Sequence, residues 1–443
     1  MRIERLILKE VGPFDDLDIT FPAGNDPERA DIYLFVGPNG SGKSSLLYTL
    51  ARSMTPQQTD FLARLRGTDS GALVRFSNGH FVLCDSYGNT NETLLESMSD
   101  EQAEHVRKNQ TFESSNYIHW PDGGDGVLDK LSRASESFPN DFKTDYAGFA
   151  YSTKRTVNTG RVQQIAEHRF NPLEDALTFT ATENESNDFV QWLANTITKK
   201  ALALMRGATE EADRRQASLS RLQHTLTTIT GLSVQFSMAE TPLSVQLRLA
   251  ETWLELDVLP EGLKSILSWL GDLLMRLENI QWSTNVALTD RSFTLLLDEI
   301  EVHLHPVWQR RLLPTLQTLF PNAQIFLATH SPFVVASAND AYIYPITLDE
   351  HGKAHVTNDD VLPSRLGHSY PAILSEVFGL DSEFDLETEE KLEHFRDLRA
   401  RKLKGEAVDD ALNALVKELS DRSVELRDIM ARELRSLARL EKG

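Results

Sequence analysis

The stretch Gly37-Pro38-Asn39-Gly40-Ser41-Gly42-Lys43-Ser44 matches the P-loop pattern G-x-x-x-x-G-K-[ST] at every fixed position. The short apolar run 32–36 before it predicts a buried strand, and apolar residues at helical spacing over 46–54 predict a helix after it. A glycine-rich turn between a strand and a helix binds phosphate, because backbone N–H groups and the positive end of the helix dipole face the anion. Lys43 is expected to reach the β- and γ-phosphates of ATP, and Ser44 to bind Mg²⁺. The predicted phosphate-binding residues are Gly37, Pro38, Asn39, Gly40, Ser41, Gly42, Lys43, Ser44 and Ser45.

The composition is that of a globular protein with an acidic surface. A length of 443 residues suits about two or three domains, and 40% hydrophobic residues are enough for a core. The single Cys84 excludes an internal disulfide framework and a cysteine-rich zinc site. No run approaches the ~18 apolar residues that span a membrane, so we expect a cytoplasmic protein with no membrane contact. The net charge of −21 argues against a surface that coats nucleic acid but leaves room for a local basic groove.

A second buried strand, 293–297, ends in two carboxylates that suit a Mg²⁺–ATP site. Asp298 is expected to hold Mg²⁺ together with Ser44, and Glu299 to polarise the attacking water. A third strand ends at His330, and the helix expected over 306–320 would bring it next to the carboxylate strand, where the imidazole could contact the γ-phosphate. The predicted catalytic residues are therefore Lys43, Glu299 and His330.

The segment between these strands, Glu301-Val302-His303-Leu304-His305-Pro306, contains two histidines beside acids. Such residues could bind a metal, but a tight turn leading into a helix explains the segment more simply, and we favour the turn.

Hydrophobic patterning divides the rest of the chain. The tail contains amphipathic helices over 408–419 and 426–437, whose apolar stripes must bury against the head or a partner. Five basic residues of the tail could also dock an acidic surface: Arg396, Arg399, Arg401, Lys402 and Lys404. The expected parts are an N-terminal head lobe with the P-loop (1–91), a polar insertion (92–141), a further head segment (142–185), a helical arm (186–227), a C-terminal head lobe (228–360) and a helical C-terminal region (361–443).

Together these motifs resemble the ABC-type ATPase superfamily that contains SMC, Rad50, RecF and the OLD nucleases. The stretches GPNGSGKSS, LLLDEIEVHLHP and THSP carry the resemblance, and LDEIEVHLHPVWQ is particularly like the compact OLD-like ATPases of bacterial defence systems. The resemblance covers roughly residues 1–91 and 142–350. It implies an α/β fold, namely an ABC-type P-loop ATPase head (a mixed sheet with an antiparallel β subdomain) with a helical arm and a C-terminal helical region. It also implies that two heads sandwich ATP and that each offers a signature loop to the other's γ-phosphate.

The signature loop is best matched by residues 259–265. Pro260 occupies the serine position of the family, so slow hydrolysis or a substitute role for Ser265 stays open, and Pro260 also simply suits the first turn of a helix. The loop predicts nucleotide contacts from Glu261, Gly262 and Lys264.

The Q-loop of the family is also irregular in this chain. A glutamine is expected after the strand that ends at Tyr151, but Ser152-Thr153-Lys154-Arg155 stands there, and Gln163 and Gln164 come late. Arg155 could contact phosphate or lie on the surface, and both interpretations stay open.

The tail lacks the strand-borne carboxylate cluster of the OLD nuclease domain, so we expect an ATPase (ATP phosphohydrolase) without a nuclease domain of its own. The tail loosely resembles PtuA-type ATPases of the Septu antiphage system, which implies an oligomeric ATPase with an HNH nuclease on another chain. The first hypothesis is thus an ATP-binding sensor and scaffold that regulates an effector nuclease from a neighbouring gene, as a head-to-head dimer or higher oligomer, with only indirect contact to DNA. The alternatives are a RecF/SMC-like DNA-repair ATPase and a nucleotide-gated assembly protein with negligible turnover.

Overall fold

The computed structural model describes residues 1–55, 60–67, 69–85, 94, 96, 103, 117–119, 143–152, 160–165, 170–179, 183–364, 370–379 and 384–440. The chain forms two compact units, Met1–Ile373 and Leu374–Gly443. Apart from a few residues, the polar insertion expected over 92–141 lies outside the described residues, and so does Arg155.

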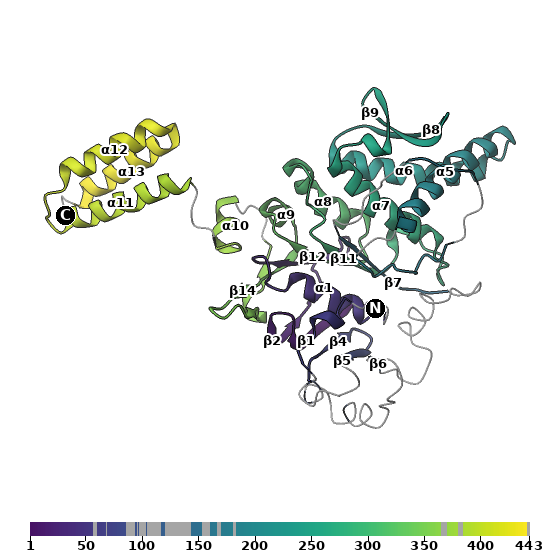
Figure 1. Ribbon diagram of the computed structural model, residues 1–443, viewed down its shortest axis with the longest axis horizontal. Helices are drawn as coiled ribbons and strands as arrows, with labels where there is room; N and C mark the ends of the chain where they lie inside the picture. The colour runs from purple at the N-terminus through teal and green to yellow at the C-terminus, as the bar shows by residue number, and fades with distance from the viewer. Residues whose placement is uncertain are drawn as a thin grey trace. The chain divides into compact units, whose positions relative to one another are not determined.

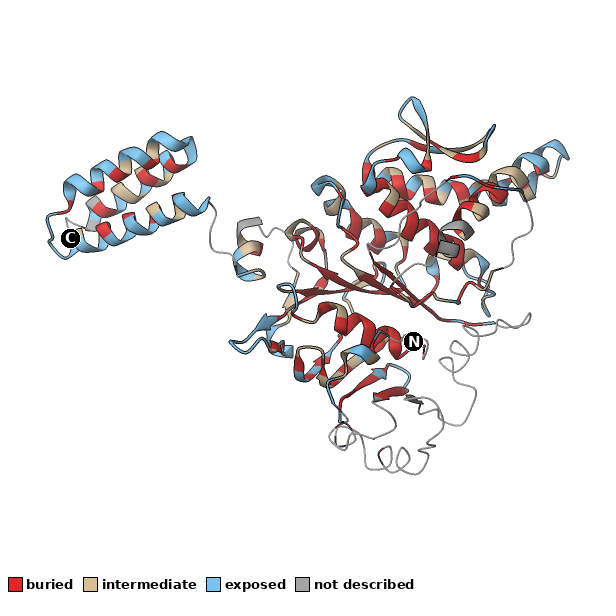
Figure 2. Cartoon of the chain, viewed as in Figure 1, coloured by how far each residue is buried: buried red, intermediate tan, exposed pale blue. Residues whose placement is uncertain are grey.

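A six-stranded sheet forms the centre of the first unit. Its order is β16-β13-β3-β12-β11-β7, and every neighbouring pair is parallel except the antiparallel pair of β16 and β13. The central strands are buried along almost their whole length and are mostly apolar, because other elements cover both faces of the sheet (Figure 2). The strands are β3 (Asp31–Val36), β7 (Ala147–Ser152), β11 (Phe293–Asp298), β12 (Ala323–Thr329), β13 (Ala341–Pro345) and β16 (Leu362–Pro363).

Helices and a second sheet cover the two faces of this central sheet (Figure 1). On one face lie α1 (Lys43–Arg52) and the second sheet. On the other lie α7 (Glu261–Asn279), α8 (Pro306–Leu319) and α9 (Pro332–Ser337). The strand before the P-loop, the helix after it, and the helix between the carboxylate strand and the histidine strand are all confirmed.

The second sheet is antiparallel and has the order β2-β1-β4-β5-β6. Phe21 follows β2 and makes edge-to-face contacts with Tyr33 of β3 at 5.2 Å and Phe326 of β12 at 4.9 Å, which fasten the N-terminal strands to the central sheet. With these two sheets, the arm and the tail described next, the predicted fold class is confirmed. The strands are β1 (Ile3–Val11), β2 (Phe14–Thr20), β4 (Gly71–Phe76), β5 (Phe81–Asp85) and β6 (Tyr117–His119).

The helical arm is an antiparallel pair, α5 (Glu183–Met205) and α6 (Thr209–Thr230), which extends beyond the range expected for it at both ends. A three-stranded meander of order β10-β9-β8 follows the arm. Its strands are β8 (Val234–Glu240), β9 (Leu243–Leu249) and β10 (Thr252–Glu255). The remaining short elements are the hairpin of β14 (Thr347–Leu348) and β15 (Ala354–His355), the helix α10 (Tyr370–Glu376), and 3-10 turns at Leu62–Arg64, Leu256–Val258, Leu288–Asp290 and Asn358–Asp360.

The tail folds on itself. Its helices are α11 (Leu386–Leu403), α12 (Asp409–Arg422) and α13 (Val424–Leu440). Their apolar stripes form one core of Leu392, Phe395, Leu398, Val408, Leu412, Leu415, Leu419, Leu426, Met430 and Leu437. The expectation that these stripes need the head or a partner to bury them was therefore wrong, because each stripe buries the other two.

The expected basic patch of the tail is largely neutralised within the same unit. Arg399 pairs with Glu433 at 2.7 Å, and Lys402 pairs with Asp409 at 2.7 Å. Arg401 pairs with Glu406 at 2.8 Å. The pattern along the chain could not reveal these acids, because α12, α13 and the turn at Glu406 bring them to α11.

Candidate active site

The P-loop is closely packed at two of its glycines. Gly42, the N-cap of α1, has a φ of 92°, and a Cβ there would lie 2.5 Å from the ring of Phe14. A Cβ on Gly37 would lie 2.4 Å from the carbonyl oxygen of Ile346. Only glycine satisfies the left-handed backbone at the first position and the close backbone approach at the second. The residues that surround the loop thus require the glycines of the motif independently of any ligand.

Lys43 is folded over this loop. Its side chain is buried, and its Nζ donates to the carbonyl oxygens of Gly37 at 3.0 Å and Pro38 at 2.9 Å. Burial lowers the pKa of Lys43, and the carboxylates of Glu299 and Asp298 oppose that shift. The ammonium group therefore lies over the turn that would hold phosphate, within the field of both carboxylates.

Ser44 and Asp298 meet at the start of α1. The Ser44 hydroxyl donates to Oδ1 of Asp298 at 3.1 Å. Burial is the largest cause that raises the pKa of Asp298 to about 6, and the Ser44 hydrogen bond opposes it. A half-buried carboxylate beside a hydroxyl fits a hard cation, which would favour the ionised form. Mg²⁺ at nucleotide sites needs only one or two carboxylates besides the phosphates, so these two residues suit it.

Glu299 and His330 come together because β11 and β12 are parallel neighbours that end at the same edge of the sheet. His330 Nε2 lies 2.8 Å from Oε1 of Glu299, an ion-pair distance without hydrogen-bond alignment. Burial is the largest cause that lowers the pKa of His330, and the charge of Lys43 adds to it. The imidazole is therefore biased toward its neutral form.

Glu299 also has a strained backbone. Its φ is 53°, in the left-handed region that non-glycine residues seldom adopt, and its N–H donates to the carbonyl of Ala328 at 3.0 Å. Strain of this kind concentrates at functional sites, where the surroundings hold a side chain in one required direction.

The signature-like loop makes its contacts elsewhere. Pro260 is the N-cap of α7, and Glu261 pairs with Lys264 at 3.0 Å. Gly262 is buried, and a Cβ on it would lie 2.6 Å from the carbonyl oxygen of His303. Contact with the turn after β11 thus gives a second reason for the glycine, and the nucleotide contacts of Glu261, Gly262 and Lys264 stay a prediction.

The segment 301–306 is a turn leading into α8, as we favoured. His305 caps that helix by accepting a hydrogen bond from the N–H of Val307 at 3.3 Å, and His303 has a φ of 70° within the turn. Among the described residues, no three His, Cys, Asp or Glu side chains gather as they would around a metal held by protein alone.

Arg64 is a residue of the site that the sequence did not indicate. Its guanidinium donates to Oγ of Ser45 at 2.9 Å and lies 4.3 Å above the ring of Tyr48. Its charge lowers the pKa of Asp298. A long-range hydrogen bond from the N–H of Gly12 to the carbonyl of Arg64, at 2.7 Å, brings it there, and no local pattern announces that pairing.

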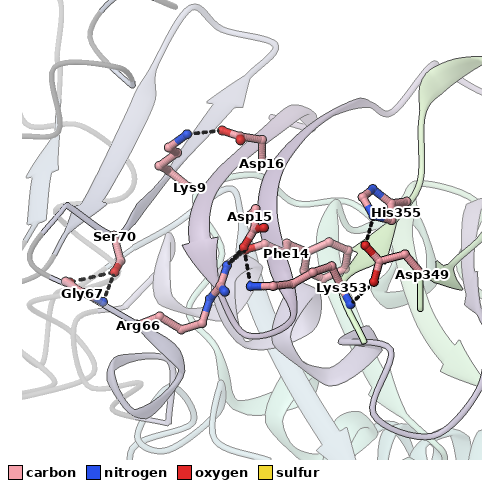
Figure 3. Close-up of polar contacts among 10 residues, drawn as sticks. All are labelled: Lys9, Phe14, Asp15, Asp16, Arg66, Gly67, Ser70, Asp349, Lys353 and His355. Atoms are coloured by element: carbon pink, nitrogen blue, oxygen red, sulfur yellow. Dashed lines mark hydrogen bonds and ion pairs between the residues drawn. The ribbon is translucent and has the colours of Figure 1, made fainter. Parts of the chain in front are cut away.

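An ionic cluster ties three segments together beside the P-loop (Figure 3). Asp15, after the β1–β2 turn, pairs with Arg66 and, at 2.7 Å, with Lys353 of the β14–β15 hairpin. Hydrogen bonds from Lys353 and Arg66 lower the pKa of Asp15 to about 2. The neighbours of this cluster, Phe14 and Ile346, are the residues that contact the P-loop glycines, so the cluster supports the shape of the loop.

Two protein-family models match parts of the chain. One, described as "AAA domain", matches residues 1–109, which include the P-loop. The other, described as "AAA domain, putative AbiEii toxin, Type IV TA system", matches residues 199–336, which include Asp298, Glu299 and His330. The two matched segments together contain both halves of the candidate site, and they support an ATPase domain.

The curated relatives belong to defence systems. A Septu protein PtuA from Bacillus thuringiensis is 29% identical over 127 residues, which are 28% of this chain and 32% of the relative. The Retron Ec83 probable ATPase from Escherichia coli is 34% identical over 96 residues, which are 22% of this chain and 18% of the relative. The chain thus spans about a third or less of the length of these relatives. The resemblance to ABC-type ATPases of bacterial defence systems is confirmed.

Among solved structures, a chain described as "Crystal structure of the SmcHead bound to the C-winged helix domain of ScpA" covers 82% of this chain and 98% of its own length, with a TM-score of 0.45 and 12% identity. The SMC head domain from Thermotoga maritima covers 83% and 100%, with a TM-score of 0.40 and 14% identity. Within the part of the chain that the structure describes, no helix combines the length and apolarity that crossing a bilayer demands.

Proposed function

We propose that this chain binds Mg²⁺–ATP at its P-loop and hydrolyses it. One observation carries the proposal: the Ser44–Asp298 pair, at 3.1 Å, and the Glu299–His330 pair, at 2.8 Å, converge beside the buried ammonium group of Lys43. Phosphoryl transfer to water needs a positive charge on the phosphates, a cation and a carboxylate that orients the water. These are the groups that the five side chains offer.

Each side chain has a distinct role in this proposal. Lys43 stabilises the charge that develops on the β- and γ-phosphates, and Ser44 and Asp298 hold Mg²⁺, which when bound neutralises phosphate charge. Glu299 accepts a hydrogen bond from the attacking water. His330, biased toward its neutral form, can donate one N–H to the γ-phosphate.

The assembly and the partner are further parts of the proposal. Two heads would enclose ATP, with Glu261, Gly262 and Lys264 of one head facing the γ-phosphate of the other, and the dimer would extend to a higher oligomer. The names of the relatives support a role in antiphage defence, in which the chain would be a sensor and scaffold for an effector nuclease, of HNH type, encoded by a neighbouring gene. We expect contact with DNA to be indirect.

Glu299→Gln tests the hydrolytic step. The amide keeps the shape of the side chain but removes the charge that orients water, so turnover should fall by roughly a hundredfold or more while ATP binding persists. Turnover is measured by phosphate release, and binding by calorimetric titration with a non-hydrolysable analogue. Lys43→Ala is the matched variant, and it should lose ATP binding because it removes the positive charge on the phosphates. Unchanged turnover in Glu299→Gln would move the general base elsewhere, and unchanged affinity in Lys43→Ala would exclude residues 37–44 as the phosphate site.

The defence role has its own experiment. The chain is co-expressed with the product of its neighbouring gene, and native mass is measured with and without ATP. A complex whose mass exceeds that of the dimer supports the scaffold, whereas a chain that stays separate from this product but binds DNA with a steep salt dependence supports the DNA-repair alternative.

A further inference from the structure

Glu301 is a buried carboxylate that the proposed chemistry does not use. It lies three residues beyond the end of β11, and only 4% of it is exposed. Its Oε1 accepts hydrogen bonds from the hydroxyl of Thr329 and, at 3.3 Å, from the backbone N–H of His330. Its Oε2 is buried without a hydrogen-bond partner among the described residues. Burying a carboxylate costs free energy, so a function of Glu301 would explain why a carboxylate stands at this position.

Hydrogen bonds of Gln309 also connect the backbone around Glu301 to the C-terminal end of β12. Gln309 of α8 donates from Nε2 to the carbonyl oxygens of Glu301 at 3.2 Å and Leu304 at 3.0 Å. The Oε1 of Gln309 accepts a hydrogen bond from the Ser331 hydroxyl at 2.6 Å. Residues 299–305, which we call the catalytic turn, are thus joined to the residues on both sides of His330.

The catalytic turn also reaches α7. Glu299 and His303 both have left-handed φ values, 53° and 70°, so this turn has little freedom to relax. The carbonyl of His303 packs against Gly262 at the start of α7, with no room for a Cβ. Any shift of the catalytic turn therefore changes both the direction of Glu299 and the contact with α7.

We propose that Glu301 is the positioning residue of this site, which holds the catalytic turn and the backbone of His330 in the register that brings Glu299 and His330 together. The proposal rests on the proposed ATP hydrolysis. Glu301 would act through its two hydrogen bonds, without touching nucleotide. Misplacement of a catalytic group by about 1 Å can cost on the order of a hundredfold in rate.

Glu301→Ala and Glu301→Gln separate positioning from mere stability. In Glu301→Ala, kcat for ATP should fall by on the order of a hundredfold. KM should stay within about threefold, because the P-loop that binds the phosphates is unchanged. Glu301→Gln keeps an acceptor oxygen for Thr329 and His330, so it should restore kcat to within roughly tenfold of wild type. Glu240→Ala makes the same chemical change at an exposed glutamate of β8, outside the catalytic turn and the P-loop, so as the matched control it should leave kcat unchanged.

A double-mutant cycle with Thr329→Val tests the route of the effect. If Glu301 acts through Thr329 and His330, the loss in the double variant should be much smaller than the product of the two single losses. Additive losses, or a Glu301→Ala variant with kcat within threefold of wild type, would overturn the proposal.

A second readout does not depend on turnover. The ring titration of His330 is followed by NMR in protein labelled at histidine, and the signal is assigned by its loss in His330→Asn. In Glu301→Ala the midpoint should rise toward the ordinary value, because His330 would leave its half-buried place near Lys43. A midpoint unchanged from wild type would contradict the positioning role even if the wild-type chain proved not to hydrolyse ATP.

Discussion

At the scale of single residues, the site contains carboxylates held in places that disfavour their charge. Burial raises the pKa of Asp298 to about 6 and that of Glu301 to about 7. Groups shifted in this way are typical of functional sites. Asp298 would regain its charge beside a bound cation, whereas hydrogen bonds from the Thr329 hydroxyl and from the backbone N–H groups of Glu301 and His330 oppose the effect of burial on Glu301. The free protein therefore holds these carboxylates at a cost in stability.

Glu301→Gln should show this cost as a pH-dependent gain in stability. The pKa of Glu301 in the folded chain is about 7, above its ordinary value of 4.5. The folded chain therefore favours the protonated form of Glu301. The stability that this preference contributes is fully present below pH 4.5 and is lost as the pH rises through 7. The difference between the two pKa values corresponds to roughly 3 kcal/mol. Urea unfolding at pH 5 and pH 8 measures this. The free energy of unfolding of the variant, relative to that of the wild type, should be higher at pH 8 than at pH 5.

The control for this experiment is Glu350→Gln, which changes an exposed glutamate of the same charge. It should leave the difference between pH 5 and pH 8 as in the wild type. If Glu301→Gln behaves like this control, Glu301 is not held in the charge-disfavouring environment that the structure gives it.

In the candidate site, the residues that the sequence could predict are those that belong to a local motif. Lys43, Ser44, Asp298 and His330 follow buried strands at known offsets, and the sheet brings them together. Arg64 was not predictable, because it reaches the site through a backbone hydrogen bond with Gly12, more than fifty residues away along the chain. The sequence marks Glu301 as a possible metal ligand, but its hydrogen bond with Thr329 exists only once β11 and β12 are paired.

At the scale of elements, α7 connects the end of β7 to the region of the signature-like loop. The helix is apolar and buried, yet it contains an ion pair between Asp272 and Arg276 at 2.7 Å, with both side chains about 5% exposed or less. Tyr151 at the end of β7 donates to Asp272 at 2.8 Å, and Arg276 donates to the carbonyl of Glu174 at 2.7 Å. The apolar spacing predicted the helix α7. It could not predict that the Asp272–Arg276 pair is buried, because that depends on the packing of α7 against β7.

Arg276→Ala should destabilise the head strongly. The variant leaves Asp272 buried without its ionic partner, and breaking a buried pair from one side costs about 3–5 kcal/mol. Chemical denaturation followed by tryptophan fluorescence measures the loss. The matched control is Arg248→Ala, which removes a pair with Glu251 whose carboxylate is 90% exposed. That change should cost less than about 1 kcal/mol. Equal losses in the two variants would show that the buried pair is no more important than a surface pair.

At the scale of the whole chain, the candidate nucleotide site lies in one compact unit and the tail forms another. Every residue proposed to bind or hydrolyse nucleotide lies before Ser331, within Met1–Ile373. Among the described residues, those that form the core of Leu374–Gly443 all belong to that unit. The sequence predicted the amphipathic helices of the tail but not their mutual packing, because a periodic stripe shows which face is buried and not what covers it.

Removal of residues 386–443 should therefore leave a folded head. The deletion removes α11 to α13 and their shared core together, so it exposes no apolar stripe of those helices. Size exclusion with light scattering should find a soluble species, and titration with a non-hydrolysable analogue should find wild-type affinity. Aggregation of the truncated chain would mean that the tail covers part of the head.

The excised tail, residues 380–443, should fold alone, but only marginally. A unit of this size buries a small fraction of its surface, so its stability is expected to be a few kcal/mol. Leu419→Ala, at a fully buried position, should cost about 2–5 kcal/mol and so unfold most of the fragment. Leu403→Ala makes the same chemical change at a side chain that is 46% exposed and should change stability by no more than about 0.5 kcal/mol. Circular dichroism with thermal melting distinguishes the two. A fragment that melts without cooperativity, or that tolerates both changes equally, would mean that the tail requires the head to fold, and the division of the chain into two units would not hold in solution.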